Sequence, residues 1–299
     1  MDLHPTVPIF PIMIFLSFVA MLLPWAWIKR DNTGILFLSL WIAIACLNQF
    51  VNSVIYPPSR VIVGISVAIP ASALCMARRL YHICSMKAFL LTPTQKRRAL
   101  IEDLCICLGI PILQMAIGHR FNILEDIGCY PAAYNVWLTY VLCDSWTVII
   151  GIVSAIYSVA RNGKEIDKFI EDKVDRKHYD RLIILSSFVI IFDAPFTVVI
   201  MIVNLTTMPL YPYIGWEDTH FNYSRVDEIP AAVWRSDAAF NAKMEMARWI
   251  LVLLAILFYG LFGFSTEAMN VYKKGFWTVS GFLGIKNRPS SIPQEILPQ

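Results

Sequence analysis

Two carboxylates, Asp144 and Asp193, stand inside long apolar stretches of this chain. An ionisable side chain near the centre of a membrane helix costs about 2.5–3.5 kcal/mol in insertion experiments, so it normally faces the interior of a helix bundle. There it could contact a ligand, carry a proton or hold a switch closed. The alternative is a structural hydrogen bond to the backbone or to an amide side chain, for which the chain offers Asn48, Gln49 and Gln114.

The other reactive side chains do not combine into a catalytic or metal site. The five histidines are scattered over termini, helix ends and loops, whereas a zinc hydrolase needs its ligands at short spacing. The last apolar stretch, 249–269, contains no Lys, which excludes a retinal Schiff base. We therefore predict no catalytic residue, no metal and no cofactor, and we do not expect an enzyme. A net charge of +3 gives no case for nucleic-acid binding.

Seven apolar stretches must position these residues. Hydrophobic residues make up 57% of the chain and the mean hydropathy is +0.59, which argues against a soluble globule. A helix needs about 20 apolar residues to cross a bilayer. The sequence therefore predicts an all-α, integral membrane seven-transmembrane helix bundle over residues 1–275, followed by a short cytoplasmic tail, 276–299. The predicted spans are 7–28, 33–56, 61–86, 100–118, 135–160, 182–205 and 248–272.

Basic residues set the orientation. Of the 25 Lys and Arg, 19 fall in segments that would share one side of the membrane. The positive-inside rule then places the N-terminus outside and the C-terminus in the cytoplasm. In this topology Asn222 opens an Asn-x-Ser sequon on the outer side and is a candidate glycosylation site. The third inner segment, 163–181, pairs acids and bases at helical spacing, which suits either a docking surface or a solvated helix.

The predicted outer side carries one long segment and one notable cysteine. Residues 211–248 are rich in aromatic and acidic side chains and could form a lid, with Trp216 and Trp234 expected as interfacial anchors. Cys129 is the only cysteine that clearly faces the oxidising side. No extracellular disulfide is therefore predicted.

Several residue strings narrow the class of protein. They are Gly64 to Pro70 followed by Arg78-Arg79-Leu80-Tyr81, Gly128-Cys129-Tyr130-Pro131-Ala132, Ser224-Arg225-Val226 with Ile229-Pro230, and Arg248-Trp249 through Phe262-Gly263-Phe264 to Tyr272. With these strings the chain resembles the fungal lipopeptide pheromone receptors of the a-factor type, which are class D G-protein-coupled receptors. It lacks the Asp-Arg-Tyr and Asn-Pro-x-x-Tyr motifs of rhodopsin-like receptors.

The resemblance implies a multi-pass plasma-membrane receptor that binds a farnesylated peptide pheromone and activates a heterotrimeric G protein in mating. A prenyl chain gains about 0.8 kcal/mol per buried CH₂, so it could enter an apolar groove from the membrane lipid. Homodimerisation is left open. The ligand contacts expected from their location are Glu125, Asp126, Asp144, Asp193, Glu217, Asp218 and Tyr223. Activation would move the sixth helix and expose the G-protein contacts, which are expected to be Arg78, Arg79, Arg161, Arg176 and Arg181.

The chain differs from the family pattern at one loop, and a second function is possible. Only Tyr56 to Arg60 joins the second and third helices, where the family usually has a longer loop with a Trp-Cys-Asp element. Cys129 thus lacks its expected partner, which predicts either a damaged pocket or a second outer loop that is held differently. The alternative function is a proton- or cation-coupled small-solute transporter using Asp144 and Asp193. Against it, the sequence shows no internal repeat.

Overall fold

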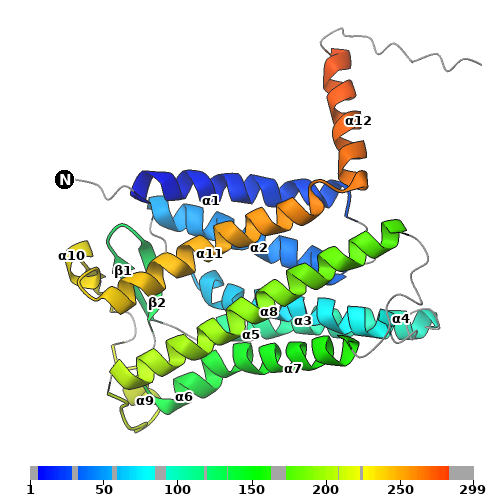
Figure 1. The fold of residues 1–299 in the computed structure, drawn as a ribbon. Coiled ribbons are helices and arrows are strands. Elements are labelled where there is room, and N and C mark those ends of the chain that lie inside the picture. Colours follow the sequence, from blue (N-terminus) through cyan, green and yellow to red (C-terminus); the bar gives the residue numbers. More distant parts are fainter. Residues whose placement is uncertain are drawn as a thin grey trace, which may run out of the picture.

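Apolar helices of membrane-spanning length dominate the fold. A computed structural model describes residues 6–28, 33–55, 59–84, 92–117, 120–132, 134–162, 173–207, 209–222 and 225–282. Within these residues, seven helices are long and apolar enough to cross a membrane. Figure 1 shows them running side by side as one bundle, with a small sheet at one end. The predicted seven-helix fold is confirmed.

The first three spanning helices are nearly continuous, whereas the fourth and fifth change their winding. The first consists of α1 (Thr6–Leu22) and η1 (Leu23–Ala26), and the next two are α2 (Thr33–Ile55) and α3 (Val61–Cys84). The fourth joins α4 (Pro93–Leu104), the π-helical turn η2 (Cys105–Gly109) and α5 (Ile110–Ala116). The fifth joins α6 (Trp137–Thr139), the π-helical turn η3 (Tyr140–Asp144) and α7 (Ser145–Asn162). The sixth is α8 (Lys173–Thr207) and the seventh is α11 (Ala238–Phe262).

Helix α3 is the central element of the bundle. Within its membrane-spanning part, 78% of the residues are buried inside the protein, against 17% for α8. Helix α3 contacts α2, α5, α7 and α8. Small residues such as Ala68, Ser72 and Ala73 are fully buried along it. Small side chains let neighbouring helices approach closely, which is the usual basis of packing where lipid removes the hydrophobic drive between helices. Side chains of α8 such as Ile191 and Phe192 remain outward-facing, as a lipid-facing helix requires.

The π-helical turn η2 shows how one proline reshapes a span. Pro111 has no N–H, so it cannot bond to the carbonyl of Cys107 four residues earlier. The indole N–H of Trp41 on α2 donates to that carbonyl instead, at 2.9 Å and fully buried. The N–H of Ile110 reaches back to Cys105. The freed carbonyl thus becomes a link between the second and fourth helices.

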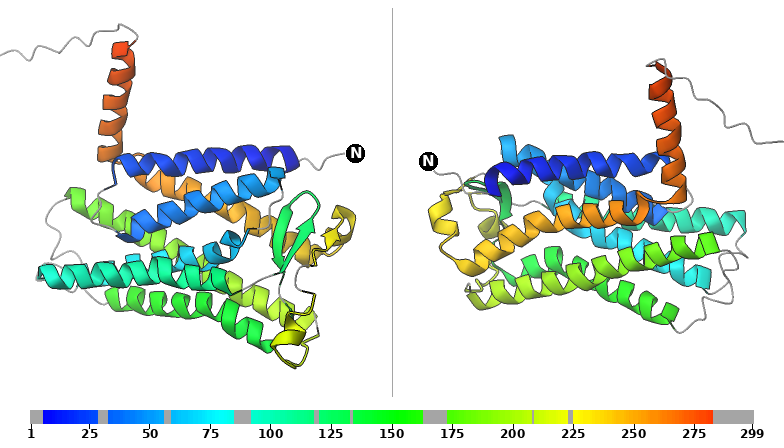
Figure 2. Two further views of the ribbon diagram at one scale, coloured as in Figure 1. Left: turned by 180° about the vertical axis from the view of Figure 1, so that it is seen from behind. Right: turned by 45° about the horizontal axis from the view of Figure 1, so that its top comes forward.

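A three-stranded sheet closes one end of the bundle. Strands β1 (Arg120–Leu124) and β2 (Gly128–Ala132) form an antiparallel hairpin, and β3 (Glu228–Ile229) pairs parallel with β1. Two short helices, α9 (Trp216–Thr219) and α10 (Ala231–Trp234), lie at the same end (Figure 2). We call this the hairpin end, formed by residues 120–132, 134–137, 209–222 and 225–237, and the opposite end the Arg78 end. The sequence did not predict this sheet.

Three spans differ from their predicted bounds by more than a few residues. The fourth begins at Pro93 rather than 100, because Thr92 and Gln95 form a capping box. The sixth begins at Lys173 rather than 182, so the charged residues before 182 do extend the helix. The part of the predicted docking segment over 163–172 lies outside the described residues.

The seventh span lies ten residues earlier than predicted, at Ala238–Phe262 instead of 248–272. The carboxylate of Asp237 caps it by accepting from the N–H groups of Ala239 and Phe240. Arg248 is tolerated inside the helix because it pairs with Glu245 at 3.1 Å and lies 4.2 Å above the ring of Phe10. A turn after Phe262 starts a separate helix, α12 (Thr266–Phe282), which crosses the predicted domain border at residue 275.

Candidate functional site

The hairpin is fixed to the bundle by an amide side chain. Asn52 near the end of α2 donates from Nδ2 to the carbonyl of Cys129 at 2.9 Å and accepts from its N–H at 2.8 Å. Gly128 has φ +114°, and a Cβ there would lie 2.6 Å from the backbone oxygen of Asn52. Only glycine combines this backbone conformation with so close an approach. The backbone of Cys129 is therefore held to the bundle through Asn52.

The Cys129 side chain is a buried free thiol. Burial raises its pKa, which disfavours the reactive thiolate.

Two predicted ligand contacts, Glu125 and Asp126, lie in the turn between β1 and β2 and bond to α10. The carboxylate of Glu125 accepts from the N–H of Ala231 at 2.7 Å, and its carbonyl accepts from the indole of Trp234 at 3.1 Å. Asp126 pairs with Arg235 at 2.8 Å. Trp234 is only 3% exposed, so its assignment as an interfacial anchor was wrong. Both acids connect the hairpin to the long outer segment, and their contact with a ligand stays a prediction.

A small cavity opens beside the hairpin. Its volume is about 80 Å³, and it is lined mainly by apolar and aromatic side chains, including Leu138, Leu142, Tyr213 and Trp216. Trp216 stacks on His220 with ring centroids 3.8 Å apart. On the adjoining fifth helix, Trp137 and Val141 are exposed large apolar residues. The cavity thus lies beside an apolar outer surface of the bundle.

The remaining outer candidates lie near this cavity or outside the described residues. Glu217 and Asp218 are exposed on α9, next to Trp216. Asn222 is exposed at a turn with φ 53°, as a glycan acceptor must be. Tyr223 falls outside the described residues.

Asp144 and Asp193 lie on neighbouring helices, η3 and α8. Asp144 interacts electrostatically with Lys243 on α11, although no ion pair within 4 Å joins them among the described residues. Asp193 Oδ2 is buried without a hydrogen-bond partner there. Gln114 donates to the carbonyl of Cys143 at 3.3 Å instead, and no hydrogen bond from the three proposed amide partners to either carboxylate occurs in the described structure. The amide hydrogen bonds proposed for these acids are therefore not observed, and the proposed bond to a neighbouring backbone group stays a prediction.

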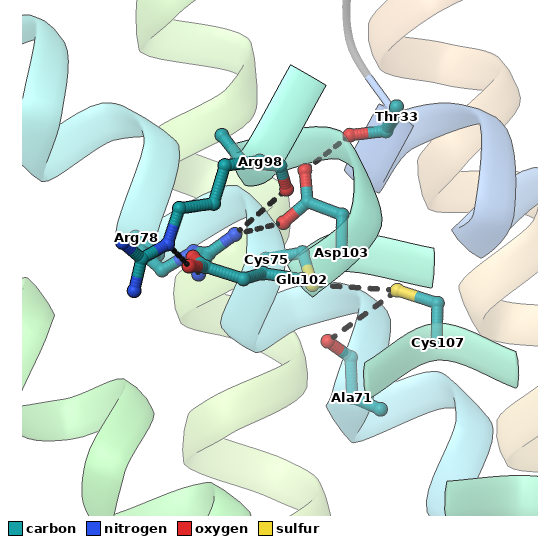
Figure 3. Close-up of polar contacts among 9 residues, drawn as sticks. Thr33, Ala71, Cys75, Arg78, Arg98, Glu102, Asp103 and Cys107 are labelled. Atoms are coloured by element: carbon teal, nitrogen blue, oxygen red, sulfur yellow. Dashed lines mark hydrogen bonds and ion pairs between the residues drawn. The ribbon is translucent and has the colours of Figure 1, made fainter. Parts of the chain in front are cut away.

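At the opposite end, Arg78 is the centre of a buried polar cluster, drawn in Figure 3. Its guanidinium pairs with Glu102 at 2.7 Å and with Asp103 at 2.5 Å, and it also donates to the carbonyl of Ala99 at 3.2 Å. The second carboxylate oxygen of Asp103 accepts from the hydroxyl of Thr33 at 2.5 Å. The Arg78 cluster therefore joins the second, third and fourth helices.

The sequence predicted no function for Glu102 and Asp103. Arg78 was expected to face a partner, yet its side chain is 13% exposed and points at these acids. The cluster could have been predicted from opposite charges at neighbouring ends of two apolar stretches. Arg78 ends the third stretch, and Glu102 and Asp103 begin the fourth. Below the cluster, the thiols of Cys75 and Cys107 are 3.4 Å apart and continue the contact between α3 and the fourth helix.

The other predicted coupling residues gather at the same end of the bundle. Arg79 lies in the last turns of α3, Arg161 is buried at the end of α7, and Arg176 and Arg181 lie in the first turns of α8. Figure 1 places these three helix termini at the Arg78 end. The structure thus brings the five arginines to one end, and their contact with a G protein stays a prediction.

Fold and sites together define a multi-pass membrane protein with seven spanning helices. No group of His, Cys, Asp or Glu that could hold a metal ion occurs in the part of the chain that the structure describes. Residues 9–281 match the STE3 family, described as the pheromone A receptor family. The protein belongs to this family.

Curated relatives support the same family over nearly the whole chain. The pheromone B alpha 3 receptor of Schizophyllum commune is 37% identical, with 97% of this chain and 51% of that protein aligned. Pheromone receptor 1 of Mycosarcoma maydis is 28% identical over 94% of this chain and 87% of its own length. The pheromone a factor receptor of Saccharomyces cerevisiae is 21% identical over 58% of this chain and 38% of its own length. The chain spans about half the length of the Schizophyllum relatives, and no solved structure matches it.

Proposed function

We propose that the protein is a plasma-membrane receptor that binds a farnesylated peptide pheromone at the hairpin end and activates a heterotrimeric G protein at the Arg78 end. The observation that carries this proposal is the family match across residues 9–281, which includes all seven spanning helices. The N-terminus would lie outside and the C-terminus in the cytoplasm, because the Arg78 end receives the Lys- and Arg-rich connections.

Ligand chemistry is supported by the cavity beside the hairpin. A lipidated peptide needs an apolar site for the chain and polar groups for the peptide. The cavity, at about 80 Å³, is too small for a whole prenyl chain, so only part of the chain would enter it. The rest would lie along the apolar outer surface of Trp137 and Val141, which membrane lipid otherwise covers. Glu217 and Asp218 would then meet the peptide portion from above.

The coupling chemistry is supported by the Arg78 cluster. In this structure Arg78 is occupied by Glu102 and Asp103, so a partner could reach its guanidinium only after the fourth helix shifts against α3. Two ion pairs hold that interface closed, and the hydroxyl of Thr33 ties Asp103 of the fourth helix to α2 as well. A ligand can open it only by binding the open arrangement more tightly than the closed one.

Nucleotide exchange on a fungal Gα subunit tests the proposal. Membranes containing the full chain would receive a panel of farnesylated peptides and their unfarnesylated twins. We expect exchange to rise with at least one farnesylated peptide and not with its twin. Equal responses to both twins, or no response to any peptide from a receptor shown to be folded and at the cell surface, would contradict the proposal.

Two matched variants separate ligand recognition from general damage. Glu217→Gln with Asp218→Asn removes both exposed acids next to the cavity. Asp227→Asn with Glu228→Gln makes the same charge change elsewhere at the hairpin end. We expect the first pair to weaken the response to the peptide and the second pair to leave it unchanged.

A transporter remains the second candidate because Asp193 carries a buried oxygen without a hydrogen-bond partner among the described residues. Such a carboxylate, on a helix that contacts the turn carrying Asp144, could bind a proton or cation during uptake. Asp193→Asn would then abolish proton-coupled uptake of the solute. Ligand-dependent nucleotide exchange on a Gα subunit would favour the receptor.

A further inference from the structure

The cavity beside the hairpin contains a single charged side chain. Among the described residues that line it, Arg120 is the only Lys, Arg, Asp or Glu, and most of the others are apolar or aromatic. Arg120 is the first residue of β1, and its backbone pairs with Ala132 of β2. Both residues line the cavity, so the register of the hairpin fixes where the guanidinium enters it. Helices α6 and α9, which also line the cavity, lie together at this end of the bundle (Figure 1).

One N–H group of Arg120 has no acceptor within the described part of the chain. The guanidinium donates from Nη2 to the carbonyl of Phe221, just after α9. Its Nε is buried and forms no hydrogen bond with the described residues. Native proteins rarely leave a buried charged donor unsatisfied, so this N–H indicates an acceptor that a ligand supplies. Because Glu217 and Asp218 do not line the cavity, the positive charge of Arg120 favours an oxygen acceptor there over a cation.

The other walls of the cavity indicate what is attached to this acceptor. Leu138 and Leu142 line the same cavity as Arg120, and their neighbours Trp137 and Val141 are exposed on the apolar outer surface. This arrangement suits a ligand in which an oxygen acceptor and a lipid chain are only a few bonds apart. A prenylated cysteine has this structure, because its carbonyl and the methylene that carries the thioether are bonded to the same Cα.

We propose that Arg120 selects the ligand by donating from Nε to the carbonyl or carboxylate oxygen of its prenylated cysteine. The first part of the prenyl chain then lies along Leu138 and Leu142, and the peptide portion leaves the cavity beside α9. This inference rests on the proposed function and adds the residue that recognises the junction between peptide and lipid. A hydrogen bond from a guanidinium is charge-assisted, so a neutral carbonyl is also bound firmly.

Three small probes with the same lipid test the proposal on the full chain in nanodiscs, without a G protein. S-farnesyl-mercaptopropionate carries a carboxylate, its amide carries a neutral carbonyl, and farnesyl butyl thioether carries neither. Competition against the tritiated thioether gives the affinity of each probe. We expect the two probes with a carbonyl group to bind the wild-type receptor more tightly than the thioether. A preference shown by the carboxylate alone would assign the acceptor to a charged end group of the ligand.

Variants of Arg120 separate the hydrogen bond from the shape of the cavity. Arg120→Met removes the donor but keeps a long side chain. It should weaken binding of each carbonyl probe about tenfold, as the loss of one charge-assisted hydrogen bond predicts, and should leave the thioether unchanged. Arg120→Lys keeps the charge and should retain part of the preference. Arg60→Met is the matched control, because Arg60 is an exposed arginine that precedes α3 and does not line the cavity.

Three results would overturn the proposal. Carbonyl probes that bind Arg120→Met as tightly as the wild-type receptor would show that Arg120 does not contact them. Equal losses for all three probes in both variants of Arg120 would show that its side chain only shapes the cavity. Binding of no probe to the wild-type receptor would also overturn it. Nucleotide exchange with farnesylated peptides would then show separately whether the proposed function stands, because that assay does not depend on these probes.

Discussion

The two ends of the bundle are held by opposite kinds of bond. At the hairpin end, the neutral side chain of Asn52 satisfies both backbone groups of Cys129. At the Arg78 end, a charged side chain bridges two carboxylates on another helix. The hydrogen bonds of a neutral amide do not depend on salt. A buried ion pair differs, because separating its partners leaves a buried charge without compensation.

This difference suits the two proposed tasks. A ligand-binding end gains from a preorganised scaffold, since ordering a loop on binding would reduce affinity. A coupling end must have two arrangements of comparable free energy, and an interface that depends on charge pairing can change between them. The predictions that follow test this contrast through free energies of unfolding measured in mixed micelles.

The largest loss is expected for Arg78→Ala. The substitution leaves Asp103 buried without its cation, and removing one partner of a buried pair costs about 3–5 kcal/mol. Arg98→Ala is the matched control, because it removes an arginine from the same Glu102 but at an exposed pair. Exposed pairs contribute about 0–1 kcal/mol. Equal losses for the two variants would show that the Arg78 cluster does not hold the helices together.

At the hairpin end, Asn52→Ala should cost about 2 kcal/mol, because unsatisfied buried polar groups cost roughly 1–3 kcal/mol. Gly128→Ala should destabilise the same contact, because φ at this position is positive and the new Cβ would lie 2.6 Å from the backbone oxygen of Asn52. Gly215→Ala is the control, since its φ is extended and a Cβ there would meet nothing within 4 Å. If Gly128→Ala were as well tolerated as Gly215→Ala, the hairpin would not be fixed in the way described.

The hydrogen bond between Trp41 and Cys107, in the middle of the bundle, allows comparison with the bonds at both ends. Trp41→Phe removes the indole donor to Cys107 and should cost about 1 kcal/mol, a typical net value for one hydrogen bond. In a Pro111→Ala background, residue 111 regains an N–H that can bond to the same carbonyl. Trp41→Phe should then cost less, and a double-mutant cycle measures the difference. Additive losses of stability would mean that the hydrogen bond from Trp41 to Cys107 does not compensate for the missing N–H of Pro111.

Much of the fold could be predicted from the sequence, because lipid requires long apolar helices and their spacing is visible in the residue types. The seventh span was displaced because its start was predicted at the charged residue Arg248, although Arg248 pairs with Glu245 inside the helix. The hairpin could not be predicted, since β1 and β2 are only five residues each. Its register depends on Asn52, which comes from a distant helix.

The site was predicted less well than the fold. Location alone assigned Glu125 and Asp126 to the ligand. The sequence could not reveal that Glu125 bonds to α10 and Asp126 to Arg235, the residue that follows α10. In the same way, the acids that pair with Arg78 lie 24 and 25 positions away. Polar contacts between helices depend on rotation about each helix axis, which hydropathy does not specify. The family match, by contrast, was predicted from residue strings and is confirmed.

The smallest effect is expected for Asp126→Asn, which breaks the ion pair with Arg235 at the hairpin end. Both side chains are about a quarter exposed, so the loss should stay below about 1 kcal/mol. High salt should remove this loss, because ions screen partly exposed pairs, while the loss from Asn52→Ala should not change with salt. A salt-independent loss for Asp126→Asn would mean that the pair acts as a buried contact. The hairpin end would then depend on charge in the same way as the Arg78 end, and the contrast between the two ends would not hold.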